Sequence, residues 1–548
     1  MINNNPDVSL ETINLTTNQD TTIVSNITRL AIQNNQSLLK VLINDFLKSK
    51  EYQEMLDVDL YYKFENKNIT NRTKQMELVE EKELIKDGKT TKQTIPYLVP
   101  DLSKANHKIA HGYLYELINQ CKNYLVGRPI KLSWKDGVSK DIKETIDDIL
   151  YKYNDWGNFN QENVKNAQKY VKSWFRLVVN DKGELKLKNV NSKEVIPFFN
   201  DMDELICVIR IYEQYEYNKN AKKVLCKYAE VYDDTYKDVY KSVSGKQYEL
   251  IESDVPLLER ITQYGDMIEQ SEALSWGKIP WVYWEFNKDK IDALQPIRCF
   301  IDILDLDISD LANNIDDIQD AVWILENYQG QSIQQFMEDL KIKKALNVGE
   351  DGKAHPETTE IPTEARMKLY DTCTKNIYKF GRGLDFSDRT NLGNASGVAL
   401  KWGYGPLDEK ADELEQNGHA ALNDLFNLLF TYLKAIGKIP DTEELDSNLL
   451  EFIFDRTMIV NEKEQVEMVE ASTDIISQKT ALENHPFVDD VEDELERLKD
   501  DEMTGVKTSN PLDEEVDEYD DIDESEETEQ EDKEDKSKEE KKSTKKSD

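Results

Sequence analysis

The spacing of apolar residues predicts helices and strands in the first half of the chain. Apolar residues recur at intervals of three and four in SNITRLAIQNNQSLLKVLINDFLKS and HKIAHGYLYELINQCKNYLVG, as in amphipathic helices. The second helix should end at Gly127, because a proline follows two residues later. FRLVVNDKGELKLKNV predicts a hairpin turning at 181–183, and ELICVIRIYEQYEY and KKVLCKYAEVYDDTY predict further strands. Residues 29–290 should therefore form an α+β region.

A heptad pattern follows from Pro296. Apolar residues alternate at spacings of four and three, which predicts a helix packed lengthwise against other helices. This seam consists of Ile297, Ile301, Leu304, Ile308, Leu311, Ile315 and Ile318. The other faces of the helix carry Asp302, Asp305, Asp307, Asp310, Asp316 and Asp317. Paired carboxylates can hold Mg²⁺, but a nuclease motif is not completed, so a solvated acidic face is the preferred interpretation.

A compact insert and a second helix come next. AVWILEN predicts a strand, SIQQFMEDLKIKKA a short helix, and NVGEDGKAH a strand end that turns at 350–352. Pro362 and Thr363 then open a helix with two stripes. The apolar stripe consists of Ala365, Leu369, Cys373, Ile377 and Phe380. The basic stripe consists of Lys368, Lys375, Lys379 and Arg382, and such a stripe is often only a solvated face.

A polar, glycine-rich loop separates this helix from a longer one. The pattern from 396 to 437 is helical, with an interruption and a kink expected at Gly405-Pro406, because proline removes a backbone hydrogen bond. Beyond it, LLEFIF predicts a short strand, and two or three amphipathic helices follow.

Composition adds the expected behaviour of the two ends. The chain has 548 residues and a net charge of −40, which argues against a protein that coats nucleic acid through a basic surface but not against brief contact with DNA. Residues 1–28 lack apolar periodicity and are expected to be a flexible arm. Residues 504–548 are strongly acidic and are expected to be disordered, because they cannot bury enough apolar surface.

Candidate chemistry is sparse. Five scattered cysteines without CxxC spacing indicate reduced thiols in a cytoplasmic setting, and no apolar run is long enough to span a bilayer. His107 and His111 would share a helix face but lack a third ligand, so we expect no metal. The chain shows no nucleotide-binding or hydrolase motif, so we expect no cofactor, no catalytic residue and no enzyme. We expect three neighbouring tryptophans to be packing or interface residues: Trp276, Trp281 and Trp284.

An ordered set of segments resembles the portal proteins of tailed bacteriophages. The central ones are LQPIRCFIDILDLDISDLANNIDDIQDAVWILENY, IPTEARMKLYDTCTKNIYKFGRGLDFSD and NASGVALKWGYGPLDEKADELE. NHKIAHGYLYELINQCKNYLVGRPIKLSW lies upstream, and DRTMIVNEKEQVEMVEAS and IISQKTALENHPFVDDVEDELERL lie downstream. The resemblance covers about residues 30–503.

This resemblance implies an α+β, mainly helical fold that assembles as a ring, usually of twelve subunits. The ring would be the channel for packaging double-stranded DNA into the capsid and ejecting it. The implied regions are a wing at 29–290, a first stem helix at 291–319, a clip at 320–362, a second stem helix at 363–383, a tunnel loop at 384–395, a long kinked wing helix at 396–437 and a crown at 438–503.

The resemblance also implies roles for particular residues. The channel and tunnel loop would present Lys368, Lys375, Lys379, Arg382, Asp385, Asp388, Arg389, Asn391 and Asn394. Flexibility of the loop would come from Gly381, Gly383 and Gly393, and the clip would bind partners through Trp323, Phe336 and Met337. Each fixed cation that neutralises a phosphate strengthens DNA binding, so a channel that releases DNA should carry few of them.

The implied partners are further copies of the chain, the terminase large subunit, a head–tail adaptor, the major capsid protein and scaffold, with no membrane. The protein would be part of the virion, at the capsid portal vertex, after assembly in the host cytoplasm. Two alternatives stay open at this point. One is another structural capsid or connector protein, although such connectors are generally shorter. The other is a metal-dependent nuclease that uses the aspartates of 302–317.

Overall fold

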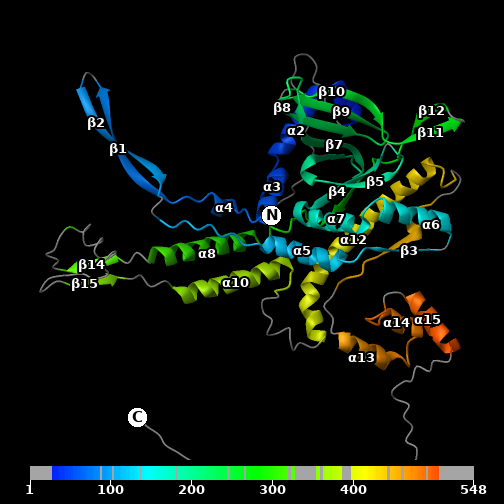
Figure 1. Ribbon diagram of the computed structural model, residues 1–548. Coiled ribbons are helices and arrows are strands. Elements are labelled where there is room, and N and C mark those ends of the chain that lie inside the picture. Colours follow the sequence, from blue (N-terminus) through cyan, green and yellow to red (C-terminus); the bar gives the residue numbers. More distant parts are fainter. Residues whose placement is uncertain are drawn as a thin grey trace, which may run out of the picture. The chain divides into compact units, whose positions relative to one another are not determined.

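The computed structural model of the chain (Figure 1) falls into two compact units, Met1–Val460 and Asn461–Asp548. In the described part of the second unit lie α13 (Glu462–Ser472), α14 (Gln478–Glu483) and α15 (Val491–Thr504), so the prediction of two or three helices is confirmed. The structure describes residues 27–86, 89–101, 104–135, 137–180, 182–243, 247–264, 267–318, 322–326, 332, 353–357, 362–385, 397–440, 445–457, 462–488 and 491–504. The predictions for 1–26 and 505–548 lie outside them.

A five-stranded antiparallel sheet forms one layer of the first unit. Its strand order is β10-β9-β8-β7-β6, so each strand pairs with its neighbour in sequence, as the predicted strands β7 and β8 do. Two helices bury apolar side chains such as Leu39 and Ile43 against Ile209 and Val231 of the sheet. The elements are α1 (Arg29–Asn34), α2 (Gln36–Lys48), β6 (Val195–Phe199), β7 (Leu205–Tyr217), β8 (Lys223–Tyr232), β9 (Tyr236–Val243) and β10 (Glu249–Pro256).

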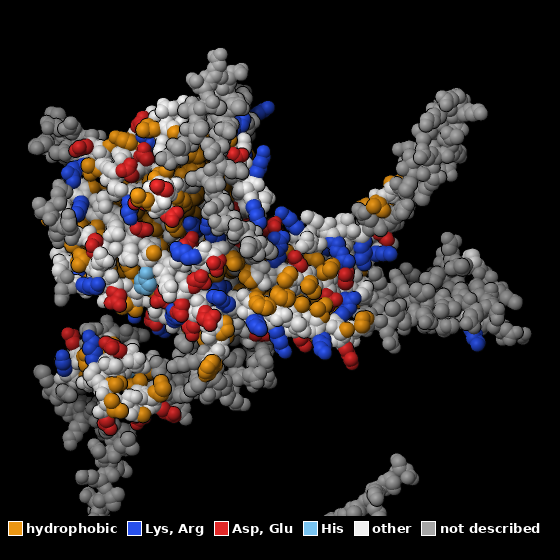
Figure 2. All heavy atoms as spheres, turned by 180° about the vertical axis from the view of Figure 1, so that it is seen from behind, with side chains coloured by type: hydrophobic (Ala, Val, Ile, Leu, Met, Phe, Trp, Pro, Cys, Tyr) orange, Lys and Arg blue, Asp and Glu red, His pale blue; other side chains and the backbone are white. Residues whose placement is uncertain are grey.

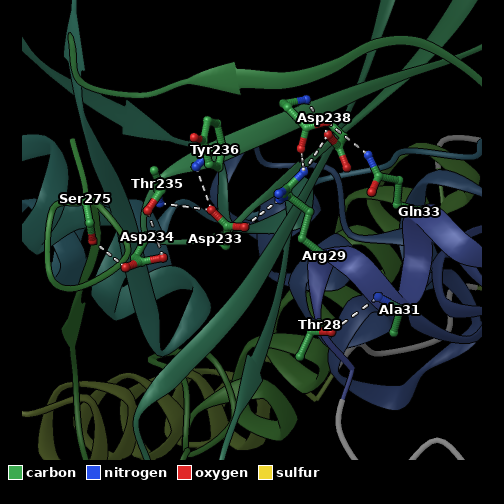
Figure 3. A network of polar contacts seen from close by, with 11 residues as sticks. Thr28, Arg29, Ala31, Gln33, Asp233, Asp234, Thr235, Tyr236, Asp238 and Ser275 are labelled. Carbon is green, nitrogen blue, oxygen red and sulfur yellow. Dashed lines mark hydrogen bonds and ion pairs between the residues drawn. The ribbon is translucent and has the colours of Figure 1, made fainter. Parts of the chain in front are cut away.

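Arg29 joins α1 to this sheet (Figure 3). Its guanidinium group lies 2.5 Å from Asp233 Oδ2, and 2.8 Å from an oxygen of both Asp238 and Asp254. The residue is only 4% exposed, and a buried cation is tolerated where carboxylates and hydrogen bonds compensate for lost hydration. The sequence predicted one helix from about residue 25 to 49, but the structure ends α1 at Asn34 and starts α2 at Gln36.

The main core surrounds a three-stranded sheet of order β13-β4-β5. The hairpin predicted at 181–183 is confirmed, and Gly183 adopts a φ of 77° in its turn. Trp276, Trp281 and Trp284 are buried, which confirms their packing role. The sheet consists of β4 (Lys172–Val179), β5 (Leu185–Val190) and β13 (Trp281–Glu285), and packs with α7 (Trp156–Tyr170) and α12 (Gly397–Ala435), which in turn contact α5 (Tyr113–Val126).

Smaller elements complete the first unit. β3 (Lys131–Trp134) pairs with β16 (Leu450–Ile453), so 450–453 belongs to this unit, which ends at Val460. The crown expected at 438–503 stays a prediction. Two hairpins form two-stranded sheets, and the sequence pattern missed both: β1 (Gln75–Lys86) with β2 (Lys89–Pro100), and β11 (Glu259–Tyr264) with β12 (Met267–Ala273). The remaining helical elements are α3 (Lys50–Tyr62), α4 (Lys67–Thr70), α6 (Lys140–Asp147), a π-helical turn (Asp148–Lys152) and two 3₁₀ turns (Ser192–Glu194, Ser447–Leu449).

Two long helices that follow the α+β region run side by side (Figure 1). They are α8 (Arg298–Ile318) and α10 (Thr363–Gly381), and between them in sequence β14 (Val322–Glu326) pairs with β15 (Lys353–Glu357). α12 is one helix that includes Pro406, so the chain stays helical at the predicted interruption, and the kink expected there stays a prediction. All five cysteines are free thiols. Among the described helices, none combines the length and apolarity that a membrane span requires.

Candidate nucleic-acid interface

α8 and α10, together called the stem pair, pack in opposite directions. Near the body of the first unit, the rings of Phe300 and Phe380 stack with their centroids 5.7 Å apart and an interplanar angle of 4°. Further out, Arg366 lies 3.0 Å from the Asp307 carboxylate and also donates to its backbone carbonyl at 3.1 Å. Residue numbers rise along one helix as they fall along the other, which establishes an antiparallel pair.

The heptad seam of α8 is buried over only part of its length. Ile297, Ile301 and Leu304 are at most 1% exposed, but Ile315 is 52% exposed. Ile308 and Leu311 are half-buried, and the side chain of Ile318 is outside the described residues. Figure 2 shows hydrophobic side chains gathered along the stem pair. Those that are exposed and described on its two helices include Ile303, Leu306, Ile315, Met367 and Leu369.

The segment before α5 was predicted to be helical, but the helix begins only at Tyr113. Its backbone instead lies along α8, and every second N–H bonds to a side chain of that helix. This pairing is possible because two residues of an extended chain advance about 6.6 Å, nearly the same as the 6 Å by which about four residues advance along a helix. The bonds are His107 N to Asn313 Oδ1 at 2.6 Å, Ile109 N to Ser309 Oγ at 3.0 Å and His111 N to Asp305 Oδ1 at 2.9 Å.

The predicted solvated acidic face is wrong for Asp305, whereas the Asp316 side chain is 49% exposed. Asp305 is fully buried and also accepts from His111 Nδ1 at 2.7 Å and from Asn66 Nδ2 at 2.8 Å. The other partners are Tyr61 and Asn66 for Asp302, Arg366 for Asp307, Arg72 for Asp310 and His107 for Asp316; the Asp317 side chain is not described.

This arrangement also revises the metal and histidine interpretations. His107 and His111 do not share a helix face, because each lies in the extended segment and pairs with a different aspartate. Within the described ranges, no group of three His, Cys, Asp or Glu residues could hold a metal ion. The described carboxylates of α8 are engaged in folding the chain, which gives the nuclease alternative no support.

The basic stripe of α10 faces outward. Lys368, Lys375 and Lys379 are exposed, and Arg382, also exposed, lies 3.6 Å from Glu413. Within the predicted apolar stripe of the same helix, Cys373 and Ile377 are buried, whereas Ala365, Leu369 and Phe380 are exposed. α10 therefore buries its apolar stripe only in the middle and presents a row of cations that ends where the loop begins.

The glycines at the start of the loop lie close to α5. A Cβ on Gly381 would lie 2.6 Å from Leu117 Cδ1, and a Cβ on Gly383 would lie 2.1 Å from Leu117 Cδ2. Both glycines therefore allow a close approach to Leu117 of α5, and their expected role in the flexibility of the loop stays a prediction. Between them Arg382 adopts the left-handed conformation that closes α10.

Several predicted residues lie outside the described residues. These are Asp388, Arg389, Asn391, Gly393 and Asn394 of the loop, and Phe336 and Met337 of the expected clip. Trp323 lies in β14, but its side chain is not described, and Asp385 is half-buried. One residue at the loop was missed: the Gln120 side chain bonds to the backbone of Leu384, and the sequence pattern marked it only as a polar position of α5.

An α+β body that carries an antiparallel pair of long helices, followed by a helix of 39 residues, defines a structural protein of the phage portal class. The family model described as "Phage portal protein, SPP1 Gp6-like" matches residues 39–507, and the chain belongs to this family. The portal protein of Clostridium phage phiCD119 is 29% identical over 421 residues, which cover 72% of this chain and 85% of that protein. The portal protein of Bacillus phage SPP1 is 27% identical over 433 residues, which cover 76% of this chain and 80% of that protein.

Solved structures with some likeness come from the necks of GTA particles. A chain of an empty particle, computed with C6 symmetry, is 9% identical with a TM-score of 0.42, and the match covers 68% of this chain and 90% of that one. A chain of a native particle, computed with C12 symmetry, is 8% identical with a TM-score of 0.36, covering 67% and 88%. The family assignment rests on the sequence matches, because these scores are below 0.5. The portal relatives also imply that the protein is a virion component.

Proposed function

We propose that the chain forms a ring-shaped channel through which double-stranded DNA enters and leaves the capsid. The ring would contain about twelve copies and stand at the portal vertex after assembly in the host cytoplasm, without catalytic activity of its own. It would dock the terminase large subunit and later a head–tail adaptor through the insert at 320–362, and contact the major capsid protein and scaffold.

The observation that supports this proposal is the exposed basic stripe of α10, which ends at the start of the loop that follows the helix. Lys368, Lys375 and Lys379 project from a helix whose buried residues face the body of the unit. Contacts of such lysines with phosphates would position a duplex without reading its sequence. The chain is otherwise strongly acidic, and a few cations in such surroundings guide DNA while keeping each contact weak.

The exposed apolar residues of the stem pair support assembly into a ring. Ile315 and Met367 are 52% and 57% exposed, on two helices that already pack against each other. Contact between this face of one copy and a different face of the next would be heterologous, and heterologous contacts that close make rings. The second copy is the occupant that we propose for this face.

Replacing Lys375, Lys379 and Arg382 by alanine tests the channel role. Ring assembly should be unchanged, because exposed substitutions alter stability by only about 0.5 kcal/mol. DNA packaged or retained per particle should fall several-fold. A matched control removes three exposed lysines of the β7–β8 turn region, Lys219, Lys222 and Lys223. Normal packaging by the α10 variant, or an equal loss in the control, would leave the basic row as a solvated face only.

A further inference from the structure

We propose that Gln120 is a positioning residue that holds the start of the loop after α10 on α5, so that the loop leaves the stem pair from a fixed point. This inference rests on the proposed function, in which that loop contacts DNA.

The contact between Gln120 and Leu384 is reciprocal. The Gln120 Nε2 atom donates to the Leu384 carbonyl oxygen at 2.7 Å, and the Leu384 N–H donates to Gln120 Oε1 at 2.9 Å. A single amide side chain thus satisfies both backbone groups of one residue, as a neighbouring β-strand would. The Leu384 side chain also packs against the main core.

The same face of α5 supplies a second contact one turn earlier. Leu117 lies three residues before Gln120, and positions i and i+3 are neighbours on a helix surface. Leu117 occupies the space that a Cβ of Gly381 or Gly383 would need. The Gly383 N–H bonds to the Tyr378 carbonyl oxygen at 3.0 Å, which closes the end of α10. Leu117 therefore packs against the backbone of Gly381 and Gly383, and Gln120 binds the backbone of Leu384, the next residue.

α12 completes the attachment from the other side. Lys410 is 3% exposed, and its Nζ lies 3.4 Å from the carbonyl oxygen of Gly381, the last residue of α10. A cation is favourable at a helix C-terminus, where carbonyl groups point outward. Burial lowers the pKa of Lys410. Three helices, α5, α10 and α12, thus meet at the point where the loop begins.

A fixed starting point has a consequence for a loop that touches DNA. Interacting groups act with the least loss of entropy when the surrounding structure holds them in place beforehand. If every subunit of a ring holds Leu384 in the same way, the chain leaves α10 from equivalent points around the duplex. Loss of the anchor should therefore weaken the grip on DNA without removing any residue that contacts it.

Hydrogen exchange at Leu384 tests the anchor directly, in assembled rings of the full chain. In the unsubstituted protein the Leu384 amide should be protected, and Gln120→Leu should lower its protection about tenfold, the effect of losing one hydrogen bond of about 1.4 kcal/mol. The matched control Gln53→Leu changes an exposed glutamine of α3 and should leave Leu384 unchanged. Unchanged protection in Gln120→Leu, or faster exchange along the whole of α5, would overturn the positioning role.

The variant Gln120→Glu adds a readout that packing alone would not produce. Its ionised carboxylate cannot donate to the Leu384 carbonyl oxygen and repels it, so the contact should open and protection of the Leu384 amide should be low at pH 7. The protonated acid can do both, so protection relative to the unsubstituted ring should recover at about pH 4. Absence of this recovery would contradict the reciprocal contact.

Packaging assays separate this inference from the proposed function. Rings with Gln120→Leu should package or retain several-fold less DNA than unsubstituted rings. Full packaging by a variant that has lost protection at Leu384 would overturn the inference while leaving the channel intact. Failure of the unsubstituted rings themselves to pass DNA would instead refute the proposed function.

Discussion

The carboxylate of Asp305 joins three segments of the chain through one buried group. It accepts hydrogen bonds from the backbone and side chain of His111 and from the buried Asn66. Asp305→Ala should lower the free energy of unfolding by about 3 kcal/mol, because it leaves buried donors unsatisfied. Denaturant unfolding followed by tryptophan fluorescence measures this change.

The exposed Asp371 of α10 provides the control for that substitution. Asp371→Ala should change the free energy of unfolding by less than about 0.5 kcal/mol. Equal effects of the two substitutions would mean that the aspartates of α8 form a solvated face after all.

Asp59 gives the structure a defined response to acid. Burial would raise the pKa of this carboxyl group, but hydrogen bonds from Lys169, Lys193 and Tyr170 outweigh it and lower the pKa to about 2. A depressed folded-state pKa stabilises above the unfolded value and is lost as the pH falls through the folded one. Between about pH 4 and pH 2 the protein should lose about 2 kcal/mol that Asp59→Asn does not lose. Parallel acid unfolding curves for the two proteins would contradict this.

At the scale of the element, replacing glycine by alanine should have opposite effects on stability at two positions of α12. A Cβ at Gly418 would lie 2.3 Å from the ring of Trp284, which is fully buried, whereas a Cβ at Gly403 meets only Leu384 at 3.9 Å. Gly418→Ala should therefore cost about 2 kcal/mol of stability through overpacking. Gly403→Ala should be neutral or stabilise the helix by up to about 1 kcal/mol. Thermal unfolding of both variants measures the difference, and equal melting temperatures would exclude this packing of α12 on β13.

The two halves of the α8 seam should also respond differently. Ile301 is 1% exposed, and Ile301→Asp should unfold or strongly destabilise the chain, because an unpaired charge would be buried. Ile315 is 52% exposed, so Ile315→Asp should leave the free energy of unfolding within about 0.5 kcal/mol but reduce ring assembly. Sedimentation measures assembly, and normal rings with Ile315→Asp would remove this half of the seam from the contact between subunits.

Periodicity predicted the elements whose burial is local. The seam of α8, the start of α10 at Thr363, the hairpin at 181–183 and the strands β7 and β8 each follow from spacing or turn chemistry that the sequence displays. The sequence predicts a solvated face for Asp305 because a charged residue is seldom fully buried. Its burial follows from hydrogen bonds with Asn66 and His111, which are distant in sequence.

The candidate site could be predicted from the sequence only where it depends on the spacing of residues within one helix. The exposed lysines of α10 were apparent from their spacing, because they share a helix face. The close approach of Gly381 and Gly383 to Leu117 was not, since glycine serves both flexible turns and close approaches, and the sequence alone does not show what lies beside it. The pairing of Gln120 with Leu384 joins positions 264 residues apart, a separation that no local pattern encodes.

At the scale of the whole molecule, the family assignment and the stem pair lead to one structural claim. Copies of the chain should close into a ring in which the basic rows of α10 and the loops beside them line a channel for DNA. Each subunit would supply the same few cations, so that the ring as a whole surrounds the duplex without binding any part of it tightly.

The mass and symmetry of the assembled particle test this claim most directly. Native mass spectrometry combined with electron-microscope class averages should show a closed ring of about twelve chains of 63.7 kDa around a hole wide enough for a DNA duplex. Particles that stay monomeric, or that close without such a hole, would contradict the account.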